Sequence, residues 1–347
     1  MATPRISAYL PPDIDPTKAA VAFGRRALPK LNEELQAPEL LTQQRALMAL
    51  CDLVHDPEKV YQAIALGFLD SLKNLLVHQD QTVRQKTTEV LSIMALHSIG
   101  REGLIRSGVI SALTGLLDDP VDICRKNTHQ IFDRLAKLPE GAAGVLRAAL
   151  VPPLLLKLET ELDEIQELIL ETLSNCLRVE VSEALAAGAL TVLKEKLSHP
   201  SAAIRSKAAW VLLEISSHAE GKMAVCKEEV IPALVSLLED TEPQVQGHSA
   251  GALMFAIVPP QGRSSAMGAE AIPPLLTLVA EETSKARLNA IKTLTLLAEL
   301  PEGRQALLDH RDTFLQCLHD PSEAVQRAAE IAIAVIDWKP FCSRDLF

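Results

Sequence analysis

The chain has 347 residues and a formal net charge of −11 at pH 7. This acidic balance argues against a protein that wraps nucleic acid, because phosphate binding needs clustered Lys and Arg. Apolar residues make up 48% of the chain but aromatic residues only 3%, so the core must consist of Leu, Ala, Ile and Val. No stretch shows the alternation of a strand. The composition therefore predicts an all-α protein whose partners are basic rather than nucleic acid.

Residues 1–20 form the first segment, and they contain Pro4, Pro11, Pro12 and Pro16. These prolines forbid a continuous helix and favour an extended arm. The arm either orders against a partner or remains a free tail. The sequence begins without the apolar region of a signal peptide, and no run of about 18 apolar residues follows. We therefore expect an intracellular protein with no membrane segment.

A repeated phrase begins at residue 26: a small or polar residue, two apolar residues, often Pro, and then Leu at helical spacing. Its copies start at Arg26, Gly67, Gly108, Ala149, Gly188, Glu229 and Glu270, with a degraded eighth copy near Arg311. Successive starts lie 41 residues apart, except for one interval of 39. This is the armadillo/HEAT period. It predicts a right-handed superhelical solenoid of about eight three-helix repeats over residues 21–340, followed by a tail at 341–347.

Each repeat contains recognisable helix boundaries. The Pro of the phrase suits the first turn of a second helix, where its missing N–H costs nothing. A third helix then opens with an aliphatic residue and a polar pair, as in Ile204–Lys207. It closes at a Gly-containing turn that includes Gly141, Gly221 or Gly303, and we expect this Gly to supply a left-handed corner. A single unit cannot bury its apolar face, so stability must come from stacking.

The fourth unit is two residues shorter than the others, and its turn at Arg178–Ser182 lacks the Pro-Glu-Gly phrase. Two interpretations remain open. The missing residues either produce a kink between two four-unit halves or are a tolerated deletion.

A concave groove is the expected binding surface. In armadillo proteins that grip extended peptides, the third helices line this groove with Trp and, one turn later, Asn. Only Trp210 and Asn175 remain at these positions, and they belong to different units. The resemblance to the armadillo family therefore implies the fold, but it does not carry nuclear-import cargo binding onto this chain.

Acidic residues replace the Asn ladder in the first five units, and apolar residues replace it in the last three. This pattern predicts a groove that is acidic at one end and apolar at the other, suited to an amphipathic helix or a basic segment. The alternative is an ordinary solvated face. We expect Trp210 to be half core. The candidate protein-binding residues are Asp52, Glu89, Asp133, Glu171, Asn175, Trp210, Glu214, Phe255 and Leu296, with Ile331 and Val335 continuing the apolar end.

The sequence lacks the common phosphate-binding and zinc-protease signals. It contains no G-x-x-x-x-G-K-[ST] or H-E-x-x-H motif. His78, His199 and His319 share a loop position but lie about three units apart, on the order of 30 Å, which is too far to share a metal. Six separate cysteines without a C-x-x-C pair indicate buried or half-buried thiols. We expect no catalysis, cofactor, metal or small-molecule substrate.

Several segments carry a more specific resemblance. Tyr9–Lys18, Arg25–Leu35, Leu40–Pro57 and the ending Ile336–Pro340 resemble the radial spoke head 14 homologues of vertebrates. The resemblance implies a non-catalytic structural subunit of the radial spokes, in the axoneme of motile cilia and sperm flagella, a part of the cytoskeleton in the cytoplasm. Its partners would be other radial spoke and axonemal proteins. The alternative is a soluble armadillo-type adaptor for transport or signalling, for which the Asn ladder or a basic surface is lacking.

Overall fold

The computed structural model describes residues 24–338, and this part of the chain consists of helices and turns without a strand. The chain divides into two compact units, Met1–Leu150 and Val151–Phe347. The predicted arm at residues 1–20 and tail at 341–347 lie outside the described residues.

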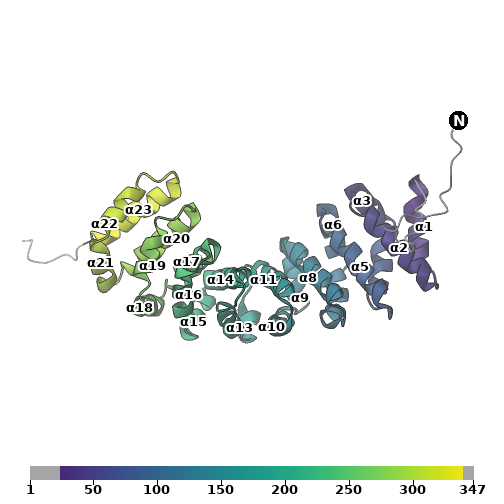
Figure 1. The fold of residues 1–347 in the computed structure, drawn as a ribbon, viewed down its shortest axis with the longest axis horizontal. Helices are drawn as coiled ribbons and strands as arrows, with labels where there is room; N and C mark the ends of the chain where they lie inside the picture. Colours follow the sequence, from purple (N-terminus) through teal and green to yellow (C-terminus); the bar gives the residue numbers. More distant parts are fainter. Residues whose placement is uncertain (1–23, 339–347) are drawn as a thin grey trace, which may run out of the picture. The chain divides into compact units, whose positions relative to one another are not determined.

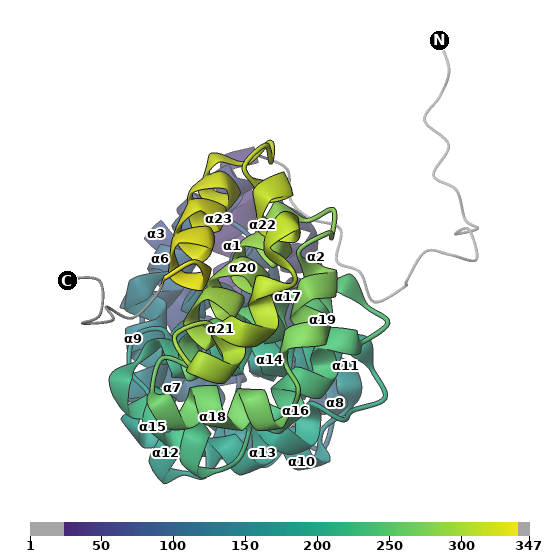
Figure 2. The ribbon, with the colours of Figure 1, turned by 90° about the vertical axis from the view of Figure 1, so that its left-hand side faces the viewer.

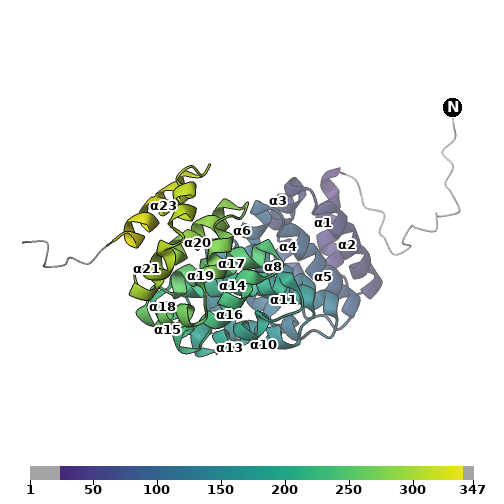
Figure 3. The same cartoon turned by 60° about the vertical axis from the view of Figure 1, so that its left-hand side comes forward.

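The first unit contains a stack of three long helices that are each the third helix of a repeat. α5 packs against α2 on one side and against α8 on the other, as Figure 1 shows. Figure 3 shows α1, α2, α4 and α5 at the beginning of the array. The elements of this unit are η1 (Gly24–Arg26), α1 (Ala27–Leu35), α2 (Leu40–Leu53), α3 (Pro57–Ala65), α4 (Phe68–Leu75), α5 (Gln81–Met94), α6 (Ser98–Arg106), α7 (Val109–Leu113), η2 (Thr114–Asp118), α8 (Asp122–Ala136) and α9 (Pro139–Arg147).

The second unit continues the pattern with five stacked third helices, in the order α11, α14, α17, α20 and α23. Figure 2 shows α17, α20 and α23 following one another. Its elements are α10 (Val151–Thr160), α11 (Asp163–Leu177), α12 (Ser182–Ala186), α13 (Ala189–Lys196), α14 (Ala202–Ser217), α15 (Ala219–Lys227), α16 (Ile231–Ser236), η3 (Leu237–Glu239), α17 (Pro243–Ala256), α18 (Pro260–Gly268), α19 (Ile272–Leu278), α20 (Ser284–Leu297), α21 (Pro301–Leu308), α22 (Arg311–Cys317) and α23 (Glu323–Ile336).

The repeat prediction is confirmed. Eight pairs of a second and a third helix follow one another in the described residues, and seven of them are preceded by a short first helix. Aliphatic side chains fill the core of each repeat, as in α14, where Ile204, Ala208, Leu212 and Ile215 are all fully buried. Their spacing of three or four residues gives one apolar face. The low aromatic content is therefore sufficient, because small and aliphatic residues allow neighbouring helices to approach closely.

Left-handed corners occur where the repeated phrase begins, between a first and a second helix. Gly67, Gly108 and Gly188 have φ of 79°, 72° and 77° there. The same corner is made by non-glycine residues in three further repeats, at Ala149, Glu229 and Glu270, with φ of 50°, 53° and 58°. The corner between α21 and α22 is not left-handed, since His310 has φ −108° there. A Cβ atom makes a positive φ unfavourable, so Gly adopts this conformation more easily than any other residue.

The predicted role of Gly141, Gly221 and Gly303 as left-handed corners is wrong. Each is the third residue of a first helix, in α9, α15 and α21. A Cβ atom on Gly141 or Gly221 would lie 1.9 Å from a carbonyl oxygen near the end of the preceding third helix, and one on Gly303 would lie 2.2 Å away. Glycine is needed because the first helix crosses the backbone of the third helix at contact distance.

The two-residue deletion in the fourth unit is accompanied by a shorter first helix and a longer connection before it, at residues 178–181. α12 has five residues, whereas α9 and α15 have nine each. The loss therefore falls between the third helix α11 and the second helix α13, and it leaves the third helices at full length. The division between the two compact units falls at Leu150, before this deletion.

The described cysteines are free thiols. Cys51, Cys124, Cys176 and Cys317 are buried and Cys226 is half-buried, as predicted, while Cys342 lies outside the described residues. Burial raises the pKa of the Cys176 thiol to about 12.

In the described residues, no single helix is long and apolar enough to cross a membrane. The consecutive helices α9 and α10 have the required length and apolar composition only when they are taken together, and they are bent by 87° where they meet.

Candidate protein-binding surfaces

The stacked third helices of each unit present a surface, which we call the third-helix face. In the first unit, two of its predicted acidic residues are paired on their own helices. Glu89 lies 2.7 Å from Lys86, and Asp133, only 5% exposed, lies 2.8 Å from Lys137. Asp52 is exposed at the end of α2. Spacings of three and four residues place such pairs side by side on a helix, so these acids have much of their charge compensated.

In the second unit, Lys207 of α14 neutralises the acidic residues of α11. Its Nζ lies 2.8 Å from Glu167 Oε2 and 2.8 Å from Glu171 Oε1, which joins two consecutive third helices. Burial lowers the pKa of Lys207, but the hydrogen bonds to both carboxylates outweigh it, and the pKa is raised. Lys207 therefore keeps its charge, and Glu171 is the partner of a cation within the chain.

Glu214 accepts two hydrogen bonds through one oxygen atom. Trp210 Nε1 and Arg178 Nη2 both donate to Glu214 Oε1 at 3.1 Å. The Trp210 ring also stacks on His248, with 5.7 Å between ring centroids and 21° between planes. Trp210 is half-buried, as predicted, and its polar N–H is satisfied within the chain. Glu214 is only 8% exposed, so it belongs to the packed interior of this face.

The remaining predicted residues have individual surroundings. The amide of Asn175 donates to the Glu171 carbonyl of its own helix at 2.9 Å. The Phe255 ring lies 5.9 Å from the Nζ of Lys222, which belongs to the first helix α15. Leu296 is half-buried on α20. Phe255 therefore contacts the first-helix layer as well as the third-helix face.

The predicted acidic half of the groove is compensated within the chain. Glu89, Asp133, Glu171 and Glu214 each have a cationic neighbour within 3.1 Å or less. Two of these cations are three or four residues away on the same helix, and the other two belong to a neighbouring third helix. The attraction of this wall for a basic segment is reduced accordingly. That these acidic residues contact a partner protein remains a prediction.

At the C-terminal end of the third-helix face lies a hollow of about 270 Å³ between α20 and α23. Of the residues predicted for the apolar end, Ile331 lines this hollow, whereas Phe255, Leu296 and Val335 do not. Two cations, Lys292 and Arg327, accompany the apolar side chains, and neither was among the predicted contact residues. The lining residues are Leu288, Lys292 and Thr295 from α20, and Ala324, Arg327, Ala328 and Ile331 from α23.

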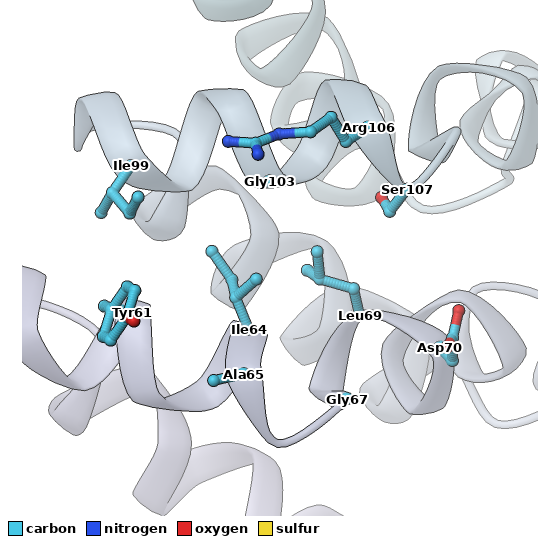
Figure 4. A pocket seen from close by; sticks show the side chains of 10 residues that line it. All are labelled: Tyr61, Ile64, Ala65, Gly67, Leu69, Asp70, Ile99, Gly103, Arg106 and Ser107. Atoms are coloured by element: carbon cyan, nitrogen blue, oxygen red, sulfur yellow. The ribbon is translucent and has the colours of Figure 1, made fainter.

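A second hollow of about 420 Å³ lies between the first helices α3 and α6 (Figure 4). Tyr61, which is 60% exposed, faces Ile99 across it, and Ile64 and Leu69 provide further apolar surface. Gly103 lets the two helices approach, because a Cβ there would lie 2.6 Å from Ile64 Cδ1. This surface was not predicted from the sequence. Tyr61 is one of only two tyrosines in the chain, and this exposed aromatic residue was the available signal.

Two of the three histidines at the shared loop position, His78 and His199, have a structural role. His78 Nδ1 accepts a hydrogen bond from the backbone N–H of Asp80 at 3.0 Å, and His199 Nδ1 accepts one from Ser201 at 3.1 Å. In the part of the chain that the structure describes, no group of three or more His, Cys, Asp or Glu side chains is placed to hold a metal ion.

Comparisons with known proteins place the repeats in a wider group. The family model described as the adaptin N-terminal region matches residues 27–339. An engineered protein of known structure is similar with a TM-score of 0.83 and 23% identity, covering 89% of this chain and 78% of that one. A designed armadillo repeat protein in complex with the peptide (KR)4 is similar with a TM-score of 0.62 and 24% identity, covering 66% of this chain and 99% of that one. At these identities the structural likeness shows the fold, an armadillo-type helical repeat.

Proposed function

This chain belongs to the adaptin N-terminal region family, and we propose that it is a non-enzymatic scaffold that binds other proteins in the radial spokes of motile cilia. The observation that carries the scaffold role is the third-helix face, a continuous layer of long helices in each unit, with a partly apolar hollow between α20 and α23. Such a surface is suited to holding segments of other proteins. The designed relative bound to (KR)4 supports peptide binding by this fold.

The radial spoke assignment is supported by the sequence resemblance. Three segments before residue 58 and the ending Ile336–Pro340 carry it. The ending includes Trp338, which is 56% exposed and stacks with the Arg304 guanidinium at 4.7 Å. An exposed aromatic at the end of a repeat array is a natural contact for a neighbouring subunit. The partners in this proposal are other spoke proteins in the axoneme, within the cytoskeleton of cilia and sperm flagella.

A soluble adaptor for transport or signalling is the second candidate, and membership in the adaptin N-terminal region family is the observation that keeps it open. The two candidates differ in where the protein is held in the cell. A spoke subunit is bound to the axoneme, whereas an adaptor is extracted together with the cytoplasm.

Cell fractionation separates these candidates. We expect the tagged full chain, expressed in cells with motile cilia, to remain on axonemes after detergent extraction and to leave only in high salt. The tag alone is the control for trapping. Recovery of the tagged chain entirely in the detergent-soluble fraction would contradict the spoke assignment and favour the adaptor. A variant lacking residues 1–17 tests whether the N-terminal arm contributes to this retention.

A further inference from the structure

The last two third helices carry cations that lack the compensation seen earlier in the same unit. Among the described residues, neither Lys285 nor Lys292 of α20 has an acidic side chain within ion-pair distance. Arg327 of α23 lies 3.6 Å from Glu323, and both side chains are largely exposed, at 76% and 84%. Water screens such an exposed pair strongly. The positive charges of Lys285, Lys292 and Arg327 are therefore available to a partner protein.

Within residues 24–338, no acidic side chain lines the hollow between α20 and α23. Its lining residues include Lys292 from one wall and Arg327 from the other, and neither Glu323 nor Glu330 is among them. Glu299, at the end of α20, is already held by Arg263 of α18 at 3.0 Å. The charged side chains that line the hollow are therefore both positive, with Glu323 and Glu330 outside the lining, although the chain as a whole is strongly acidic.

The floor of the hollow is apolar. Ile331 is 60% exposed, Ala328 is buried and Leu288 is half-buried beside them. An isoleucine with this exposure gains stability when a partner side chain covers it, since burial of apolar area is favourable. Short side chains at Ala324 and Ala328 leave the depth that an incoming aliphatic or aromatic group needs.

We propose that this hollow binds an acidic amphipathic segment of a partner protein. A bulky apolar side chain of the segment lies on Ile331, Ala328 and Leu288. Carboxylates that flank it lie beside Lys292 and Arg327. The inference rests on the proposed scaffold function and specifies its partner. It reverses the polarity expected from the sequence, because the acids at the other end of the face are compensated within the chain.

The two parts of this contact have different roles. The apolar side chain supplies most of the affinity, because it removes apolar surface from water. Each carboxylate opposite an exposed cation changes the affinity by up to about fivefold. Opposite charges also accelerate the encounter and fix the orientation. Binding should therefore weaken as salt is added, but it should not be lost.

The test uses the full chain and a labelled synthetic helix that has Leu on one face and Glu on both flanks. Two comparison peptides carry Lys in place of Glu, or Ser in place of Leu. Fluorescence anisotropy should show the strongest binding for the Leu/Glu peptide. The double variant Lys292→Glu, Arg327→Glu should weaken it by about tenfold or more, because repulsion replaces attraction at two positions.

A control double variant, Lys196→Glu, Lys227→Glu, changes the net charge equally but lies on second and first helices away from the hollow. It should bind the Leu/Glu peptide as the unmodified chain does. The proposal is overturned if the control loses as much affinity, or if the Lys-flanked peptide binds as well as the Glu-flanked one. Circular dichroism of both double variants verifies their folding.

A photo-crosslinker at the central Leu of the peptide gives an assay on the unmodified chain, in case a charge variant fails to fold. Crosslinks on α20 and α23 support the proposal, and crosslinks confined to other helices overturn it. Failure of the proposed function has a different signature. If the full chain binds the acidic peptide at the hollow but is absent from extracted axonemes, the spoke assignment fails and the binding site stands.

Discussion

Arg205 donates from Nε and Nη2 to both carboxylate oxygens of Asp240, at 2.7 and 2.9 Å, and this bidentate pair joins two consecutive repeats. Asp240 Oδ1 also accepts from the backbone N–H of Glu242 at 3.0 Å, which fixes the loop before α17. The pairs Arg84–Asp119 and Arg287–Asp320 are equivalent. Each Arg lies near the start of a third helix, and each Asp lies in the loop before the next one.

Loss of this pair should destabilise the array. In Asp240→Asn the amide keeps one acceptor, but it places a donor where Arg205 also donates. We expect a loss of about 1.5–3 kcal/mol, the usual contribution of a hydrogen bond to a charged group. Chemical unfolding measures it. Asp309→Asn, at an exposed position after α21, is the control and should change stability by less than about 0.5 kcal/mol. Equal losses in both variants would contradict the structural role of the pair.

The same pairs predict the response to acid. The hydrogen bond from Arg205 lowers the pKa of Asp240, and the one from Arg287 lowers the pKa of Asp320. The folded pKa is thus below the unfolded value of about 4. This contribution to stability is complete above pH 4 and is lost as the pH falls through the folded pKa. The thermal midpoint should fall below pH 4. Asp240→Asn should show a shallower fall than the unmodified chain, and an identical slope would exclude this origin.

Helical repeats and their period were predictable because they depend on local patterns. The phrase that starts at Gly67, Gly108 and Gly188 combines a left-handed residue with an apolar helix start, and both features can be read from neighbouring residues. The role of Gly221 could not be read in this way. Its requirement arises from the carbonyl oxygen of Ile215, which the crossing of two helices brings to 1.9 Å from a would-be Cβ.

Compensation of Glu171 and Glu214 was missed for a related reason, whereas the partners of Glu89 and Asp133 lie three and four residues away and were readable from the sequence. Lys207 lies 40 residues from Glu167, so the pair forms only after two repeats stack. The residues next to Glu171 and Glu214 in the sequence do not predict that a cation pairs with either of them. A search at repeat spacing would have found other ion pairs between repeats, because Arg84–Asp119 and Arg205–Asp240 are both separated by 35 residues. Trp210 was assigned correctly as half core because its neighbours Ala208, Ala209 and Leu212 already define an apolar helix face.

At the left-handed corners, we expect substitutions at equivalent positions to change the stability in opposite directions. Gly188→Ala should destabilise the chain by about 1 kcal/mol, since the left-handed region is strained for a side chain. No heavy atom lies within 4 Å of the Cβ that would be added, so backbone strain is the only cost. Glu270→Gly, at φ 58°, should stabilise, although the greater freedom of Gly in the unfolded chain offsets part of the gain. Thermal midpoints measure both changes, and a shift of the same sign in both variants would contradict this explanation.

Glu214 was predicted to bind a partner, but in the structure its carboxylate accepts hydrogen bonds from within the chain. Glu214→Ala removes the acceptor of Trp210 Nε1 and Arg178, two groups held at 3.1 Å. Because Trp210 is half-buried, its N–H would lose a partner in a site that water only partly reaches, which costs about 1–3 kcal/mol. Glu214→Gln retains an acceptor oxygen and should lose less. In a Trp338→Phe background Trp210 is the single tryptophan, so its fluorescence reports the site directly. We expect Glu214→Ala to lower the thermal midpoint and to shift this emission, with Glu214→Gln between it and the parent chain. Unchanged stability and emission in Glu214→Ala would instead make Glu214 a surface acid available to a basic partner, as the sequence alone suggested.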